Sequence, residues 1–501
     1  MREKLLAKNT FSSLIFQITT IICGFVLPRL ILKSYGSDVN GLVNSIVQFL
    51  QIIAFLELGV GAVVQSSLYK PLADKNNIEI SKIISSAEKF FKRIAVILLV
   101  YVVVLICVYP FIVNQDFGFI YTMTLIAAIS ISSFAQYYFG IVNRLLLTAD
   151  QRGYVQYNSQ TVVLILNTVA CAILINLDSS IQLVKLTTSL IYLLRPLYLK
   201  FYVDKYYTID RRILYKEEPI KQKWNGVAQH VAAIVLDGTA NIVLTIFSTL
   251  SNVSIYSVYY LVVYGVKRLF ISSTNGIQAL LGELWAKREL DTLNRTFGWT
   301  EWIIHTGVTF VFGCTGILIV PFISVYTSGV NDANYLQPLF AVLVTIANAM
   351  HCLRLPYNIM ILAGGHYKQT QHNYIIAVIL NIVISISVVK IWGLVGVAIG
   401  MLIALVYQTV WMAYYDSRNL IRWPFKNFVT QVIVDGISIG IAVMATRWIS
   451  LEEISYFSWL LMAIKVTVIM FLVVCVTNFI FYRDKINKLK NLIMKKCIKV
   501  K

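Results

Sequence analysis

The twenty residues IAVILLVYVVVLICVYPFIV, Ile94–Val113, contain no charged side chain. A helix of this length is about 30 Å long, which matches the hydrocarbon core of a bilayer. Similar apolar stretches recur along the chain, and only 13% of its 501 residues are charged, about half the share usual in a soluble domain. The sequence therefore predicts an all-α integral membrane protein with about fourteen transmembrane helices, near 9–33, 41–66, 92–113, 118–147, 157–176, 180–203, 225–248, 253–283, 299–326, 334–363, 371–390, 392–415, 426–446 and 457–482.

Positive charge marks one side of the membrane. With a cytoplasmic N-terminus, 33 of the 43 Lys and Arg residues fall on the inner side, and only Lys33, Lys390 and Arg447 fall on the outer side. Loops rich in Lys and Arg stay in the cytoplasm, so we expect both termini there. The formal net charge of +19 has the same origin. It therefore indicates no nucleic-acid partner, although it favours contact with anionic membrane lipids.

A faint internal repeat divides the predicted helices. When the second half of the sequence is aligned with the first so that Asn381 meets Asn167, each asparagine follows an Ile-Leu pair, and Ala363 meets Ala149. Because six is an even number, two six-helix blocks insert with the same orientation, as parallel repeats. The predicted parts are an N-terminal six-helix bundle at 1–203, a basic cytoplasmic linker at 204–224, a C-terminal six-helix bundle at 225–415, a two-helix hairpin at 426–482 and a basic cytoplasmic tail at 483–501.

The sequence favours a transporter over an enzyme. The predicted outer loops are short, as at 34–40 and 327–333, and leave no room for a catalytic domain. There is no GxxxxGK[ST] phosphate-binding loop and no HExxH zinc motif. The seven cysteines include no CxxC pair and are expected to be small apolar residues. We expect no catalytic residue, no metal site and no cofactor other than a coupling Na⁺ or H⁺.

Charges within the predicted helices are the candidate functional residues. Each costs about 2.5–3.5 kcal/mol on insertion scales and usually faces a cavity or a partner. Cations exceed anions, which suits a diphosphate or an acidic sugar better than a cationic drug. The charges are the cations Arg29, Lys185, Arg195, Lys267, Arg268, Arg354 and Lys465 and the anions Glu57, Asp237 and Asp435.

We predict that a lumen between the two halves is lined by substrate-binding cations. Several adjoin prolines, whose kinks are tolerated at membrane depth beside a cavity or protein. For Lys267 and Arg268, neighbours about 100° apart on a helix, we expect one to line the lumen and the other to pair. The predicted substrate-binding residues are Arg29, Arg195, Lys267, Arg268 and Arg354.

The remaining charges have other predicted roles. Glu57 and Asp237 are candidates for cation or proton coupling, with pairing to nearby cations as the alternative. Lys185 is expected to snorkel to the outer interface, and for Arg29 snorkelling is the alternative to a place in the lumen. Asp435 and Lys465 are expected at similar depth on the last two helices and therefore to form a structural ion pair.

Several motifs resemble those of one transporter family. They are Leu27-Pro-Arg-Leu-Ile-Leu with Tyr35-Gly, the stretch LAGGHYKQT at 362–370, Leu380-Asn381 and the stretch WGLVGVAIG at 392–400. With the arrangement of six, six and two helices, they resemble Wzx-type polysaccharide flippases of the MOP (MATE-like) exporter superfamily. The resemblance implies transport of an undecaprenyl-diphosphate-linked oligosaccharide across a bacterial plasma membrane for O-antigen, capsule or exopolysaccharide assembly. It also implies a polysaccharide polymerase and a chain-length regulator as partners.

Two alternatives remain open at this point. Within the same superfamily, the chain could be a MATE-like, cation-coupled small-molecule antiporter. In another class, it could be a membrane scaffold or a transferase component of polysaccharide synthesis. The sequence does not identify the oligosaccharide that is transported or the ion that drives transport.

Overall fold

The computed structural model describes residues 2–113, 117–215, 217–220, 227–488 and 490. Within those residues every regular element is a helix, as predicted. The elements are α1 (Arg2–Gln51), η1 (Ile52–Ala54), α2 (Phe55–Ala73), α3 (Asn77–Ile112), α4 (Phe119–Ala135), η2 (Gln136–Gly140), α5 (Ile141–Ala149), α6 (Gly153–Asn176), α7 (Ile181–Tyr206), α8 (Val227–Phe247), α9 (Leu250–Ala286), α10 (Leu290–Tyr326), α11 (Pro338–Leu353), α12 (Leu355–Ala363), α13 (Tyr367–Trp392), α14 (Leu394–Asn419), α15 (Phe425–Thr446) and α16 (Tyr456–Phe481).

Most of the predicted membrane spans are helices long and apolar enough to cross a bilayer. Ten meet this condition in the described residues, among them α1, α3, the run from α4 to α5, and α16. The other predicted spans fall on the second half of α1 with α2, and on α7, α8 and α9, which are also helical. In α7 and α9, cations such as Arg195 and Lys267 interrupt the apolar sequence. The prediction of a multi-pass, all-α membrane protein is confirmed.

The outer loop predicted at 34–40 is a kink inside α1. Only Gly36 leaves the helical conformation, with φ +83°. A left-handed φ costs glycine little because it has no Cβ. The chain therefore turns at one residue and continues directly as a helix to Gln51.

The helix bounds reproduce the predicted internal repeat. The alignment of the two halves pairs Gly153, at the start of α6, with Tyr367, at the start of α13. It pairs Asn77, at the start of α3, with Asp291, the second residue of α10. Equivalent helices of the two halves therefore begin at equivalent positions of the sequence.

The two asparagines that aligned in the sequence also have equivalent environments. Asn167 is buried on α6 and accepts a hydrogen bond from the Cys171 Sγ at 3.3 Å. Asn381 is buried on α13 and accepts one from the Ser385 Oγ, also at 3.3 Å. Each partner lies four residues later on the same helix. The local structure of the two repeats is therefore the same at this point.

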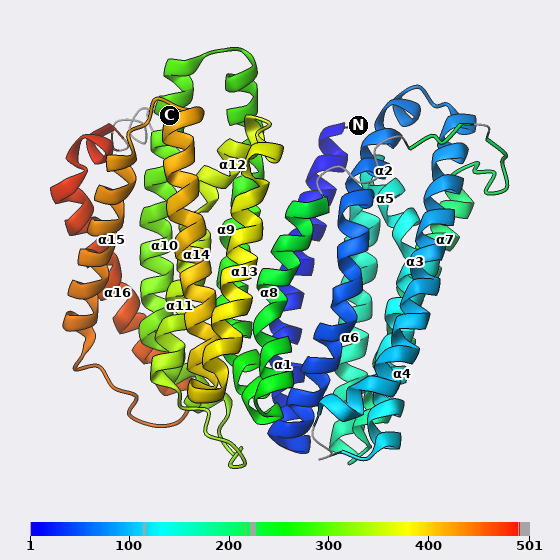
Figure 1. Cartoon of the computed structure of the whole chain (residues 1–501), viewed down its shortest axis with the longest axis horizontal. Helices are drawn as coiled ribbons and strands as arrows, with labels where there is room; N and C mark the ends of the chain where they lie inside the picture. The colour runs from blue at the N-terminus through cyan, green and yellow to red at the C-terminus, as the bar shows by residue number, and fades with distance from the viewer. Residues whose placement is uncertain (1, 114–116, 216, 221–226, 489, 491–501) are drawn as a thin grey trace. The chain divides into compact units, whose positions relative to one another are not determined.

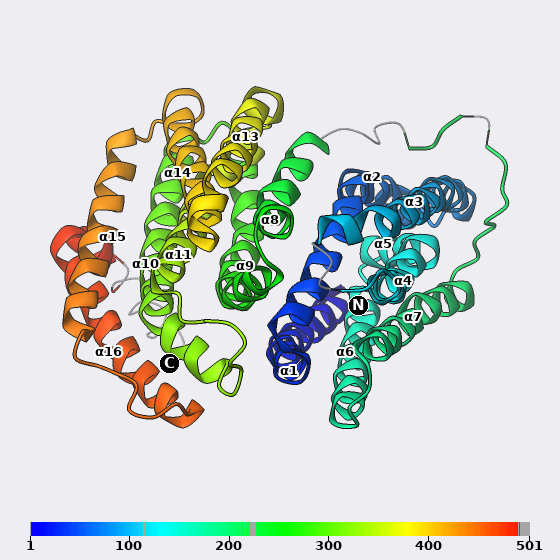
Figure 2. The ribbon, with the colours of Figure 1, turned by 60° about the horizontal axis from the view of Figure 1, so that its bottom comes forward.

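The chain forms two compact units. Unit 1 comprises residues 1–257 and 329–333, and unit 2 comprises residues 258–328 and 334–501. In each unit the helices run side by side (Figure 1), as the second view also shows (Figure 2). Helix α8, which the sequence analysis assigned to the C-terminal bundle, packs against α1 and α2 in unit 1.

Candidate functional site

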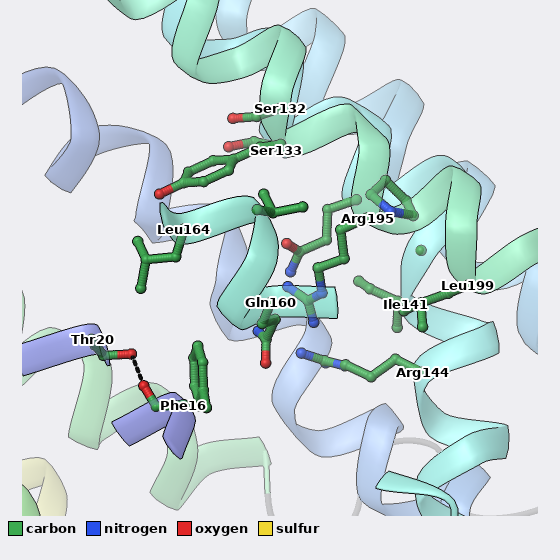
Figure 3. Close-up of a pocket in the computed structure, with 15 residues that line it drawn as sticks. Phe16, Thr20, Ser132, Ser133, Ile141, Arg144, Gln160, Leu164, Arg195 and Leu199 are labelled. Atoms are coloured by element: carbon green, nitrogen blue, oxygen red, sulfur yellow. Dashed lines mark hydrogen bonds between the residues drawn. The ribbon is translucent and has the colours of Figure 1, made fainter. Parts of the chain in front are cut away.

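A cavity of about 280 Å³ lies within unit 1. Helices α1, α4, α5, α6 and α7 and the π-helical turn η2 all contribute to its wall. Figure 3 shows the guanidinium groups of Arg144 and Arg195 on the same side of this cavity, close to the Gln160 side chain. The other lining residues are Phe16, Thr20, Ser132, Ser133, Gln136, Gly140, Ile141, Val163, Leu164, Tyr192, Pro196 and Leu199.

Two helix irregularities shape the wall of this cavity. The turn Gln136–Gly140 is π-helical, and such single turns are frequent at functional sites. Pro196 stands inside α7, where it removes one helical hydrogen bond. A Cβ on Gly140 would lie 3.0 Å from the Pro196 Cβ, so the two irregular segments approach each other closely. Gly140 therefore permits close contact between η2 and α7, whereas a larger residue would push the two segments apart.

Arg195 is held by a neutral partner. With the Gln160 amide turned so that its oxygen faces α7, that oxygen accepts hydrogen bonds from both terminal nitrogens of Arg195, at 2.9 and 3.1 Å. An amide oxygen orients the guanidinium without cancelling its charge. These two hydrogen bonds therefore orient the Arg195 guanidinium at the cavity.

A second cavity in unit 1, of about 460 Å³, adjoins the first. The two share four lining residues: Ser132, Ser133, Gln136 and Tyr192. Lys185 and Asn167 also line the second cavity. Lys185, which the sequence analysis expected to snorkel to the outer interface, is half-buried in the second turn of α7 and lines this cavity.

The wall of the two cavities is cationic. Arg144, Arg195 and Lys185 line them, and among the described lining residues none is an Asp or a Glu. Hydroxyl and amide groups supply the remaining polar atoms. A cavity between helices with this lining favours an anion, because charges attract more at low dielectric than in water. It disfavours a cation for the same reason.

A second group of cations lies in unit 2, on α9. Lys267 is 2% exposed and its Nζ donates to the Tyr260 hydroxyl at 3.3 Å. The same ammonium lies over the Tyr264 ring, 5.3 Å from its centre. The next residue, Arg268, is exposed, and its Nε donates to the Tyr264 hydroxyl at 3.2 Å. One of the two cations is therefore buried and the other exposed, although both reach Tyr264.

Arg354 also belongs to unit 2, at the break between α11 and α12. It is 6% exposed, and its guanidinium lies 3.2 Å from the His351 Nδ1. Both Arg354 and Lys267 lie within electrostatic range of His351. Phe270 of α9 also packs against the buried cluster that contains Leu353 and Leu355, on either side of this break. Unit 2 therefore brings together two of the predicted cations.

Two other predicted site residues, Arg29 and Asp237, are not among the lining residues of the two cavities. Arg29 is half-buried on α1 in unit 1, before the kink at Gly36. Asp237 is on the exposed surface of α8, and the side chain of Glu57 lies outside the described part of the chain. Convergence of cations from both halves on one lumen stays a prediction, as does a coupling role for Glu57 and Asp237.

The predicted ion pair between Asp435 and Lys465 is wrong. Asp435 bonds to the buried His305 of α10, with 2.7 Å between Oδ2 and Nδ1. The side chain of Lys465 is 58% exposed, and its nearest acid is Glu452 at 3.9 Å.

The register of the last two helices explains the error. Ser438 of α15 bonds to Thr477 of α16 at 2.8 Å. In an antiparallel pair this contact places Asp435 opposite Ile480, fifteen residues from Lys465, or about 22 Å along the helix. A similar number of residues from the outer ends of the two helices therefore did not place Asp435 and Lys465 at the same depth.

Sequence reasoning missed several cavity residues. Arg144 was counted with the cytoplasmic loop, although it lies within the predicted span 118–147 and three leucines follow it. The neutral residues Gln136 and Gln160 carried no charge signal. Their positions on the cavity side of their helices could have been found only from the packing.

One motif match has no enzymatic geometry. The residues Gly436-Ile-Ser-Ile-Gly440 match the GxSxG nucleophile motif, which requires a sharp strand-to-helix turn. Here they lie in the middle of α15, and the Ser438 hydroxyl donates to the Val434 carbonyl at 2.8 Å.

No family model and no curated protein matches this sequence. Solved structures do. The lipid II flippase MurJ in an inward closed conformation matches with a TM-score of 0.70 and 15% identity, over 94% of this chain and 100% of that chain. An inward-facing multidrug resistance MATE transporter of the MOP superfamily matches with a TM-score of 0.55 and 12% identity, over 80% and 95% of the two chains. The Vibrio cholerae MATE transporter VcmN in the bent form matches with a TM-score of 0.56 and 11% identity, over 86% and 98%. The chain therefore has the fold of MOP-superfamily transporters, over nearly its whole length in the match to MurJ.

Proposed function

We propose that this protein is a flippase that moves an anionic, polyprenyl-diphosphate-linked oligosaccharide from the inner to the outer leaflet of a bacterial plasma membrane. The observation that carries the proposal is the cationic lining of the cavities in unit 1. Arg144 and Arg195 stand together there, and the described lining includes no acidic residue.

The chemistry of the cavity suits a diphosphate. Arginine presents a planar fork of N–H donors that binds phosphate oxygens in pairs. Hydroxyl groups of Ser132, Ser133 and Tyr192 add neutral donors. A cavity of about 280 Å³ is at the lower limit for small-molecule sites. It therefore accommodates the phosphates rather than a whole oligosaccharide.

The fold is consistent with this proposal but does not select it. MurJ is named as a lipid II flippase, and the first of the two MATE proteins is named as a multidrug resistance transporter. The charge of the lining supports the flippase, because a cationic drug would be repelled by Arg144, Arg195 and Lys185. The cations of unit 2, Lys267 and Arg354, add to this preference.

The rest of the proposal follows from the resemblance to Wzx-type flippases. Both termini would be cytoplasmic, a Na⁺ or H⁺ gradient would drive transport, and a polymerase with its chain-length regulator would use the product for surface polysaccharide.

A flipping assay tests the proposal. Purified full-length protein in liposomes is given a fluorescent, short-chain polyprenyl diphosphate, and a membrane-impermeant quencher reports the leaflet of the label. Arg195→Gln should raise the dissociation constant of this probe about tenfold, the effect expected when one charge-assisted hydrogen-bonding group is lost. Arg447→Gln, which changes an exposed arginine outside the site, is the matched control.

Two results would contradict the proposal. One is wild-type protein that neither binds nor flips the diphosphate probe. The other is competition by hydrophobic cations but not by inorganic pyrophosphate, which would favour a MATE-like antiporter.

A further inference from the structure

One face of α7 lines both cavities of unit 1. Its lining residues recur every three or four positions, which places them along one side of a helix. In order from the start of α7 they are Lys185, Thr188, Ser189, Tyr192, Arg195, Pro196 and Leu199. From Lys185 to Leu199 this face extends about 21 Å, roughly two-thirds of the hydrocarbon core.

Two other helices contribute matching faces. Ser132 and Gln136, from α4 and η2, border both cavities, so the two spaces meet at these residues. On α6, Gln160 lies at the first cavity and Asn167, two turns later, at the second. Polar side chains from three elements therefore accompany the α7 face from one cavity to the next.

The cations stand at the two ends of this path. Arg144 and Arg195 occupy the first cavity, and Lys185 lies at the second, ten residues from Arg195 and about 15 Å along α7. Lys185 is in the second turn of the helix, which begins at Ile181. Hydroxyl and amide groups, but no carboxylate, separate the two cationic ends in the described lining.

We propose that the α7 face is a relay for the phosphate groups of the substrate, with Arg144 and Arg195 as the first station and Lys185 as the second. The relay rests on the proposed flippase function and names the path of the anionic group within unit 1. Paired guanidinium groups bind a diphosphate in defined geometry. A lysine ammonium is a mobile point charge with rotatable donors and holds phosphate less rigidly, which suits a station from which the anion departs.

The relay predicts different defects at its two stations. Loss of charge at Arg195 should weaken binding, whereas loss of charge at Lys185 should slow transfer and leave the first binding step intact. The test uses full-length protein in liposomes with the fluorescent polyprenyl diphosphate, and measures equilibrium binding and flipping rate separately.

Lys185→Gln should reduce the flipping rate about tenfold while the dissociation constant changes less than about twofold, since one phosphate contact is lost only after binding. Lys185→Arg should retain most of the rate because it keeps the charge. Lys390→Gln removes an exposed lysine of α13 and is the matched control. Thermal melting of each variant shows that it is folded.

The outcomes separate the relay from the flippase proposal. A wild-type flipping rate in Lys185→Gln, with weakened binding in Arg195→Gln, would overturn the relay and leave the flippase proposal intact. Equal slowing by Lys185→Gln and Lys390→Gln would show a general effect of charge and also overturn the relay. If wild-type protein neither binds nor flips the probe, both proposals fail.

Discussion

The carboxylate of Asp332 caps the second half of α1 at Ser37. Its Oδ2 accepts a hydrogen bond from the Ser37 backbone N–H at 2.6 Å, and its Oδ1 accepts one from the Ser37 hydroxyl at 2.6 Å. The kink at Gly36 frees backbone N–H groups at the start of this half-helix, and a carboxylate there also interacts favourably with the helix dipole. Asp332 is 295 residues away in the sequence and does for this helix what a local N-cap residue usually does.

Asp332→Ala should lower stability by about 1 kcal/mol, the usual cost of losing an N-cap side chain. The thermal melting midpoint of purified protein measures the effect. Glu453→Ala changes another exposed acidic residue and should leave the midpoint unchanged. An equal midpoint for wild-type protein and Asp332→Ala would show that the contact contributes nothing.

Gly36→Ala should destabilise the same region through strain. Its φ of +83° disfavours a side chain, and a Cβ there would lie 2.7 Å from the Asp332 Oδ2. The conformational part alone costs about 1–2 kcal/mol. Gly24→Ala is the matched control, because a Cβ at Gly24 meets no atom within 4 Å. In the double variant with Asp332→Ala, the combined loss should be smaller than the sum of the two single losses, since the steric clash is already removed.

The buried pair of His305 and Asp435 should be important for folding. Asp435→Ala should cost about 1–3 kcal/mol, because it leaves the buried His305 ring without its hydrogen-bond partner. Lys465→Ala should cost little, since the Lys465 side chain is 58% exposed. Folded yield after solubilisation and the melting midpoint both report the effect. Exchanging the two charges, as Asp435→Lys with Lys465→Asp, should recover neither folded yield nor melting midpoint. Recovery of either would support the ion pair between Asp435 and Lys465 that the structure contradicts.

Lys485, beyond the end of α16, should make stability depend on pH. Its Nζ donates to the Gly298 carbonyl at 2.9 Å, and it lies over the rings of Trp302, Trp423 and Tyr482. Burial lowers the pKa of Lys485 from 10.5 to about 8, against a smaller opposing effect of Glu301.

The direction of this dependence follows from proton binding. Between pH 8 and 10.5 the unfolded chain holds a proton at Lys485 that the folded protein has released, so stability should rise with pH in that interval. Lys485→Met should lack this contribution. The difference in melting midpoint between wild-type protein and Lys485→Met should therefore shift in favour of wild type as the pH rises through that interval. A constant difference would contradict the assignment.

The distribution of Lys and Arg predicts the topology of the chain. A cysteine at Glu453 should react with an impermeant thiol reagent in intact cells, and one at Asn487 should react only after the cells are opened. Both positions lie outside the predicted spans, Glu453 before the start of α16 and Asn487 after its end. Labelling of Asn487→Cys in intact cells would overturn the predicted orientation.

The sequence by itself determined the class of protein and its division into long apolar helices. A stretch such as Ile94–Val113 forms a helix in a bilayer, because a helix pairs every backbone N–H and C=O within the segment. The internal repeat was visible from Asn167 and Asn381, since equal positions in duplicated helices keep the same packing. These properties depend on local composition and spacing, which a sequence displays directly.

Only the tertiary structure decided which side chains share a site. Arg195 was a candidate from its charge, but its partner Gln160 and its neighbour Arg144 come from other helices and became visible only through packing. Asp435 was paired with the wrong residue because the axial register of two helices depends on side-chain contacts such as Ser438 with Thr477. Asp332 caps a helix 295 residues away, and no local pattern encodes that contact. A sequence shows which side chains are costly to place in a membrane. Their partners depend on the depth, rotation and tilt of each helix, which all of its neighbours set together.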